Sequence, residues 1–67
     1  MDKNALRAEF VRNGLTQAQV AAKLGMSEST LWRKLKKGTL GLDEADKLID
    51  ILKIKEPNKI FFGNRLT

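Results

Sequence analysis

The sequence predicts an all-α fold, a compact bundle of about five short helices. Proline occurs once among the 67 residues, and the glycines stand singly at the ends of periodic segments. No stretch alternates apolar and polar residues as a half-buried strand would, whereas apolar residues recur at helical spacing along most of the chain. A chain of this length has room for one compact domain, which we expect over residues 1–62, followed by a C-terminal tail over residues 63–67.

The first predicted helix begins at an N-cap and ends at a glycine. Asp2 is a favourable N-cap residue, the helix reaches about Asn13, and Gly14 can supply a left-handed stop. The apolar residues expected on its inward face are Leu6, Phe10 and Val11.

The second predicted helix opens with a capping box, Thr16-Gln17-Ala18-Gln19. In such a box the side chains of the first and fourth residues each accept a hydrogen bond from the other's backbone N–H. Gly25 ends this helix, and its inward residues are Val20, Ala21 and Leu24.

The third helix is expected to start at the N-cap Ser27 and to run through about Lys36, with Gly38 closing it. Leu31 and Leu35 are four residues apart and therefore face the core together.

The remaining chain predicts one more full helix and a short helical turn. After a loop over residues 39–42, the fourth helix is capped near Asp43. Its inward stripe consists of Ala45, Leu48, Ile49 and Leu52. Pro57 breaks the pattern, and residues 58–62 are expected to form the short turn. The apolar residues of this turn that are expected to close the base of the core are Ile60, Phe61 and Phe62.

The spacing between the second and third helices predicts a helix-turn-helix. The small side chain of Ala21 lets two helices cross closely, and Gly25, four residues later, tolerates the left-handed backbone of a tight turn. Met26 and Leu31 then hold the following helix against the preceding one. The exposed face of residues 27–36 is left free to enter a DNA major groove, which is about 12 Å wide and accepts one helix.

The charge of the chain is distributed unevenly. Thirteen basic and eight acidic residues give a net charge of +5 and a pI near 9.9. Residues 1–40 hold eight basic and three acidic residues, a difference of +5, whereas residues 41–67 hold five of each. This asymmetry favours a polyanionic partner for the first forty residues, and a merely solubilising surface is the alternative.

The composition argues against catalysis. The chain has no histidine and no cysteine, and its acids are typical of helix starts and surfaces, so no nucleophile–base pair or metal-ligand set is available. We therefore expect no enzymatic activity, cofactor, metal or small-molecule substrate. The absence of cysteine fits a reducing compartment, and no apolar run approaches the roughly 18 residues that span a bilayer. We expect a cytoplasmic protein with no membrane partner.

One segment carries a resemblance to a known family. Residues 15–31 read Leu-Thr-Gln-Ala-Gln-Val-Ala-Ala-Lys-Leu-Gly-Met-Ser-Glu-Ser-Thr-Leu. This stretch resembles the Cro/CI family of phage-type repressors in its leading Leu-Thr-Gln, its Ala, its Gly and its Ser-x-Ser-Thr-Leu run. The clear match covers roughly residues 6–42, and the ending Pro-Asn-Lys-Ile-Phe-Phe is similar to that of short prophage Cro-like proteins. The resemblance implies a lambda-repressor-like domain that binds double-stranded operator DNA and regulates transcription.

The resemblance implies that part of the third helix reads bases. Glu28, Ser29 and Arg33 fall where the family contacts base edges, and Arg33 could form two hydrogen bonds with a guanine. As alternatives, Arg33 pairs with Glu28 or contacts only phosphate, and Glu28 serves the helix dipole instead of accepting from a cytosine.

Other positions are expected to contact the DNA backbone. Gln17 should bond a phosphate or brace the third helix, and Ser27 should cap that helix and also meet a phosphate. Lys36, Lys37 and Thr39 fall where the family's loop grips the backbone, which positions the protein without specifying sequence. For each of these residues the alternative is an ordinary solvated or capping role.

Two residues depart from the family pattern. Lys34 stands where the family has an apolar or aromatic residue, and Leu35 can take over that packing. Trp32 stands where a small polar residue is common, at the rim between core and groove. Its ring is expected either to pack on thymine methyl groups or the sugar–phosphate edge, or to fold back over the loop of residues 39–42.

Other functions remain open for the same helices. A protein-binding anti-repressor or antitoxin-like module would show little salt dependence, and a DNA-bending recombination cofactor would bind DNA without repressing. We also expect a homodimer on DNA that is weakly associated or monomeric when free and that uses residues 60–66, because one helix reads only a few base pairs.

Overall fold

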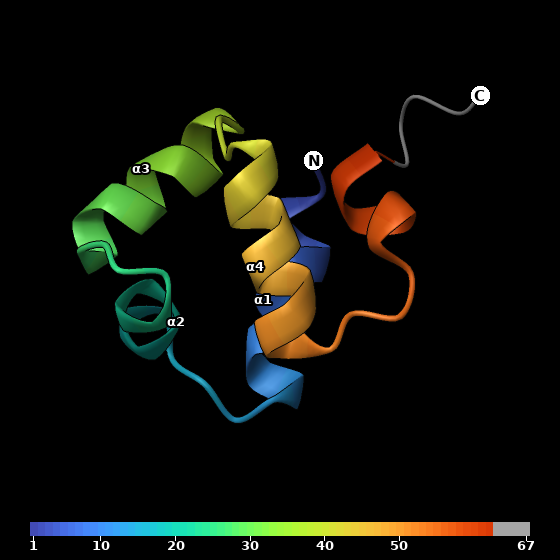
Figure 1. The fold of residues 1–67 in the computed structure, drawn as a ribbon, viewed down its shortest axis with the longest axis horizontal. Coiled ribbons are helices and arrows are strands. Elements are labelled where there is room, and N and C mark those ends of the chain that lie inside the picture. Colours follow the sequence, from blue (N-terminus) through green and yellow to red (C-terminus); the bar gives the residue numbers. More distant parts are fainter. Residues whose placement is uncertain (63–67) are drawn as a thin grey trace.

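A computed structural model describes residues 1–62, and the predicted tail over residues 63–67 lies outside the described part. Five helices follow one another without any strand in these residues, which confirms the all-α prediction: α1 (Lys3–Arg12), α2 (Gln17–Lys23), α3 (Glu28–Lys37), α4 (Leu42–Leu52) and the short π-type helix η1 (Asn58–Phe62). α2 and α3 lie together on one side of α4, and η1 lies on its other side (Figure 1). Within residues 1–62 no helix has the length and apolar character needed to cross a membrane.

The predicted N-cap residues start the first two helices as expected. Asp2 accepts a hydrogen bond from the N–H of Ala5 at 3.0 Å and caps α1. Thr16 and Gln19 form both halves of the capping box of α2, at 3.1 and 2.9 Å. Gly14 adopts the left-handed conformation that the sequence predicts after α1, and Gly38, which closes α3, adopts it as well.

The start of α4 differs from the sequence prediction. The N-cap is Gly41 and not Asp43, and Leu42 is the first helical residue instead of part of the loop. The reason is that Glu44 reaches back and accepts a hydrogen bond from the N–H of Gly41 at 2.9 Å. Asp43 consequently lies in the first helical turn, where its charge suits the helix dipole.

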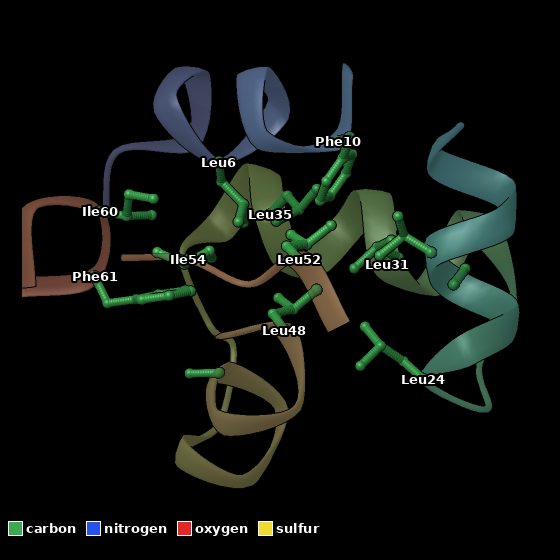
Figure 2. Packing of buried hydrophobic residues seen from close by; sticks show 13 residues of the cluster. Leu6, Phe10, Leu24, Leu31, Leu35, Leu48, Leu52, Ile54, Ile60 and Phe61 are labelled. Carbon is green, nitrogen blue, oxygen red and sulfur yellow. The ribbon is translucent and has the colours of Figure 1, made fainter. Parts of the chain in front are cut away.

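The core joins all five helices (Figure 2). Its buried members are Leu6, Phe10, Val20, Ala21, Leu24, Leu31, Leu35, Ala45, Leu48, Leu52, Ile54, Ile60 and Phe61. The expected inward position of Val11 is wrong, because this side chain is 78% exposed, and Ile49 is only partly buried. The buried stripe of α1 runs through Leu6 and Phe10, and Val11, about 100° further around the helix, falls outside it. Phe62 was also expected to close the base of the core, but its side chain lies outside the described part of the structure.

Side chains from the end of α1 hold the end of α4. Arg12 Nη2 and Asn13 Nδ2 donate to the carbonyl oxygen of Leu52 at 2.8 and 3.0 Å. Arg12 also forms an ion pair with Glu9 at 2.5 Å. These hydrogen bonds satisfy a carbonyl group at the end of α4. Because Arg12 is also paired with Glu9, its charge stabilises the fold and is not free to bind a ligand.

One ion pair links α3 to α4. Lys34 Nζ lies 2.6 Å from Glu44 Oε2, so Lys34 occupies the flank of α3 that faces α4. The hydrogen bond from Lys34 is the main cause that lowers the pKa of Glu44 below its usual value, and the N–H of Gly41 acts in the same direction. A carboxylate whose pKa is lower in the folded protein stabilises the fold above its unfolded-state pKa, and this contribution disappears as the pH falls through the lowered value.

We expect Glu44→Gln to remove this pH-dependent contribution while its amide oxygen can still cap Gly41. At neutral pH the variant should lose at most about 1 kcal/mol of unfolding free energy, since the pair is partly solvated. Its difference in Tm from the wild type should shrink as the pH falls below about 4.5, the ordinary pKa of this group. Thermal melts across pH 3–7 measure this, with Asp50→Asn on the same helix as the control. A deficit that stays constant with pH would contradict the assignment.

Candidate nucleic-acid interface

The turn between α2 and α3 has the geometry that the sequence spacing predicts. Gly25 adopts a left-handed conformation with φ of 74°. The N–H of Met26 donates to the carbonyl of Ala21 at 3.0 Å, which ties the turn back to α2. Ala21 and Leu31 are both buried where the two helices meet. Because the small Ala21 side chain allows a close approach, α3 is held firmly against α2.

α3 has one buried face and one exposed face. Leu31 and Leu35 are buried, which also confirms that Leu35 supplies the packing that Lys34 cannot. The predicted site residues of this helix that are exposed to solvent are Glu28, Ser29, Trp32, Arg33, Lys36 and Lys37. Arg33 lies about half a turn from the buried stripe and is therefore central on the exposed face.

The N-terminal end of α3 is capped by Ser27. Its Oγ accepts from the N–H of Thr30 at 3.2 Å and donates to Thr30 Oγ1 at 2.8 Å. Arg33 Nη2 donates to Thr30 Oγ1 at 3.3 Å. Arg33 does not form the ion pair with Glu28 that was one of the alternatives. Glu28 forms no ion pair in the described part of the chain, and it occupies the first turn of α3, where an acid suits the helix dipole.

Three further predicted residues lie at the C-terminal end of α3, and one lies in α2. Lys36 and Lys37 end the helix, Thr39 comes directly after its C-cap, and all three are exposed. Neither lysine is neutralised by an acid within residues 1–62. Gln17 stands apart as the first residue of α2, where it is partly buried.

Trp32 lies at the edge of the exposed face and does not join the core. Its side chain is 42% exposed, and the guanidinium carbon of Arg7 lies over its ring, 5.7 Å from the centroid. The ring thus lies beside Arg7 of α1. Sequence reasoning did not single out Arg7. Its only signal was a basic residue next to the buried Leu6, which does not reveal the helix that it faces.

The charges of α3 form an open basic surface. Of its four cations, Lys34 is paired with Glu44, whereas Arg33, Lys36 and Lys37 have no acidic partner in the described residues. Cations that project from one helix without neutralising acids create a positive potential that attracts a polyanion. The geometry is a helix-turn-helix whose second helix has one basic, exposed face and packs its other face against the core.

Comparison with known proteins identifies this part of the chain. The sequence model of the family described as bacterial regulatory protein, Fis family, matches residues 3–38. The match begins at the first residue of α1 and ends at the C-cap of α3, so it covers the helix-turn-helix and more than half of the 67 residues. Comparisons with curated proteins and with solved structures give no significant match. The chain therefore belongs to the Fis family of bacterial regulatory proteins and is a transcription regulator that binds double-stranded DNA through its helix-turn-helix.

Proposed function

We propose that the protein is a sequence-specific, Cro/CI-like repressor that binds operator DNA by placing α3 in the major groove. The observation that carries the proposal is the exposed face of α3, where Arg33, Lys36 and Lys37 project without acidic partners from a helix fixed by its other face. A helix of this kind fits the major groove, in which each base pair presents a distinct donor and acceptor pattern.

Base recognition is assigned to the middle and the start of the exposed face. Arg33 has further guanidinium donors besides the one that bonds Thr30, and two of them match the O6 and N7 acceptors of a guanine. Ser29 is exposed beside it and can donate to or accept from a base edge. Glu28 has no partner in the described residues, which is compatible with accepting from a cytosine amino group.

Backbone contacts are assigned to the residues that surround this face. Lys36, Lys37 and Thr39 lie together at the C-terminal end of α3 and can bind successive phosphates. Ser27 and Gln17 stand at the starts of α3 and α2, where backbone N–H groups add to the attraction for a phosphate. Such contacts set the orientation of α3 in the groove without specifying sequence.

The resemblance of residues 15–31 to phage-type repressors supports a prophage origin, a cytoplasmic site of action and a palindromic operator bound by two chains. The segment expected to join the two chains is residues 60–66, and its first two residues do not fit that role. Ile60 and Phe61 are buried in the core of a single chain and do not offer a surface, and the rest of that segment is outside the described side chains.

We expect operator affinity to fall steeply with salt. About four to six phosphate contacts per subunit predict a slope of log affinity against log salt near −4 to −5 for each subunit. Titrations of labelled operator DNA by fluorescence anisotropy between 50 and 300 mM salt measure this slope. An affinity that stays flat over this range would favour a protein-binding module over a DNA-binding one.

Arg33→Ala and Lys37→Gln should separate base reading from backbone contact. Loss of Arg33 is expected to cost about 1–3 kcal/mol of operator affinity and to relax the preference at one base pair. Loss of Lys37 should weaken binding to all sequences alike and reduce the salt slope by about 0.9. Affinity selections from random DNA compare the two variants. Equal effects on preference would show that Arg33 binds phosphate only.

We expect two chains to occupy one full operator, because a single α3 covers only a few base pairs. Sedimentation velocity should detect a monomer or a weak dimer in the free protein and two chains on operator DNA. A single chain on a full-length operator at saturating protein would refute the dimer.

A further inference from the structure

Arg7 is an exposed cation in α1 whose charge is not paired with an acid in the described residues. It forms no hydrogen bond or ion pair within residues 1–62, and its one interaction there is with the ring of Trp32 in α3. The other arginine of α1, Arg12, is committed to Glu9 and to the end of α4. Arg7 is therefore a free positive charge that α1 places against the DNA-reading helix.

The position of Trp32 on α3 places this charge at the edge of the major groove. Trp32 and Lys34 are two residues apart and thus about 200° apart around the helix, so they lie on opposite flanks. Lys34 faces α4 through its pair with Glu44, and Trp32 faces α1 through Arg7. An α-helix with its side chains is about 10–12 Å across, and the major groove is about 12 Å wide, so both flanks of an inserted helix approach the phosphate walls.

The contact between the two side chains suits a phosphate ligand. A cation over an aromatic face is attracted by the ring, and a guanidinium in this position keeps N–H donors available at its edge. Arginine is the residue that binds phosphate oxygens with two parallel hydrogen bonds. The ring also limits the conformations of a long, exposed side chain, which reduces the entropy that is lost when it binds.

We propose that Arg7 binds a DNA phosphate at the wall of the groove that holds α3, and that Trp32 is a positioning residue that holds Arg7 there. This inference rests on the proposed function, because it places α3 in the major groove. It extends the DNA-binding surface to α1, beyond the helix-turn-helix itself. Trp32 then contributes to affinity through Arg7, without itself reading a base.

Arg7→Gln is the first test, with Lys55→Gln as the control that removes the same charge. Lys55 is exposed in the segment between α4 and η1, away from α3 (Figure 1). At about 0.1 M salt, Arg7→Gln should weaken operator binding about tenfold and reduce the salt slope by about 0.9, without changing base preference. Lys55→Gln should have a much smaller effect on both. Equal effects of the two variants would overturn the inference, while a steep salt slope of the wild type would leave the proposed function standing.

A double-mutant cycle tests the positioning role of Trp32. Trp32→Leu should reproduce the loss of affinity and of salt slope seen with Arg7→Gln, and the double variant should lose little more than either single one. Trp32→Phe keeps an aromatic face and should restore most of the binding. Thermal melts check that each variant is folded. Losses that add fully, or a Phe variant no better than the Leu variant, would show that Trp32 does not act through Arg7.

The contact is also measurable without DNA. Trp32 is the single tryptophan of the chain, so its fluorescence reports on this site alone. Arg7→Gln should change the emission of the free protein, and Lys55→Gln should not. Identical spectra for the wild type and Arg7→Gln would remove the contact on which the inference depends.

Discussion

The burial of Leu31 and Leu35 is the constraint on which the rest of the site depends. These two residues fix the rotation of α3 about its axis, and the close approach at Ala21 fixes its distance from α2. Once that rotation is set, Arg33 must project outward, and Lys34 and Trp32 must fall on opposite flanks. The surface that is proposed to face DNA therefore follows from the packing of the opposite face of the same helix.

The cations of the chain serve two different purposes. Arg12 caps the end of α4, and Lys34 ties α3 to α4 through Glu44, so both hold helices in place. Arg33, Lys36 and Lys37 have no acidic partner among the described residues and remain available to a ligand. Net charge alone does not reveal this division, because it counts a paired lysine and an unpaired one alike. Under the proposed function, the second group and Arg7 supply the electrostatic attraction for DNA.

Much of the fold follows from local chemistry and could be predicted from the sequence. The caps at Asp2, Thr16 and Ser27 depend on neighbours within three residues, and the positive φ of Gly25 depends on the turn alone. The sequence predictions fail where the position of a side chain depends on elements that are distant in the sequence. Which of two adjacent apolar residues in α1 is buried depends on how α4 and η1 cover that helix. Similarly, the approach of Arg7 to Trp32 joins residues 25 positions apart, and no local pattern encodes their separation.

Recognition and stability are separated by the polarity of the two faces of α3. The core of the described chain contains no buried polar or charged residue, so none of the residues proposed to read bases contributes to it. A change at an exposed position such as Ser29 or Arg33 therefore leaves no unpaired polar atom in the interior, whereas a change at Leu31 would shift the whole helix. In a chain of 67 residues, whose stability margin is small, this separation allows the proposed base preference to vary at little cost to folding. Trp32 is the intermediate case, because its ring contacts Arg7 of α1 while 42% of its side chain is exposed.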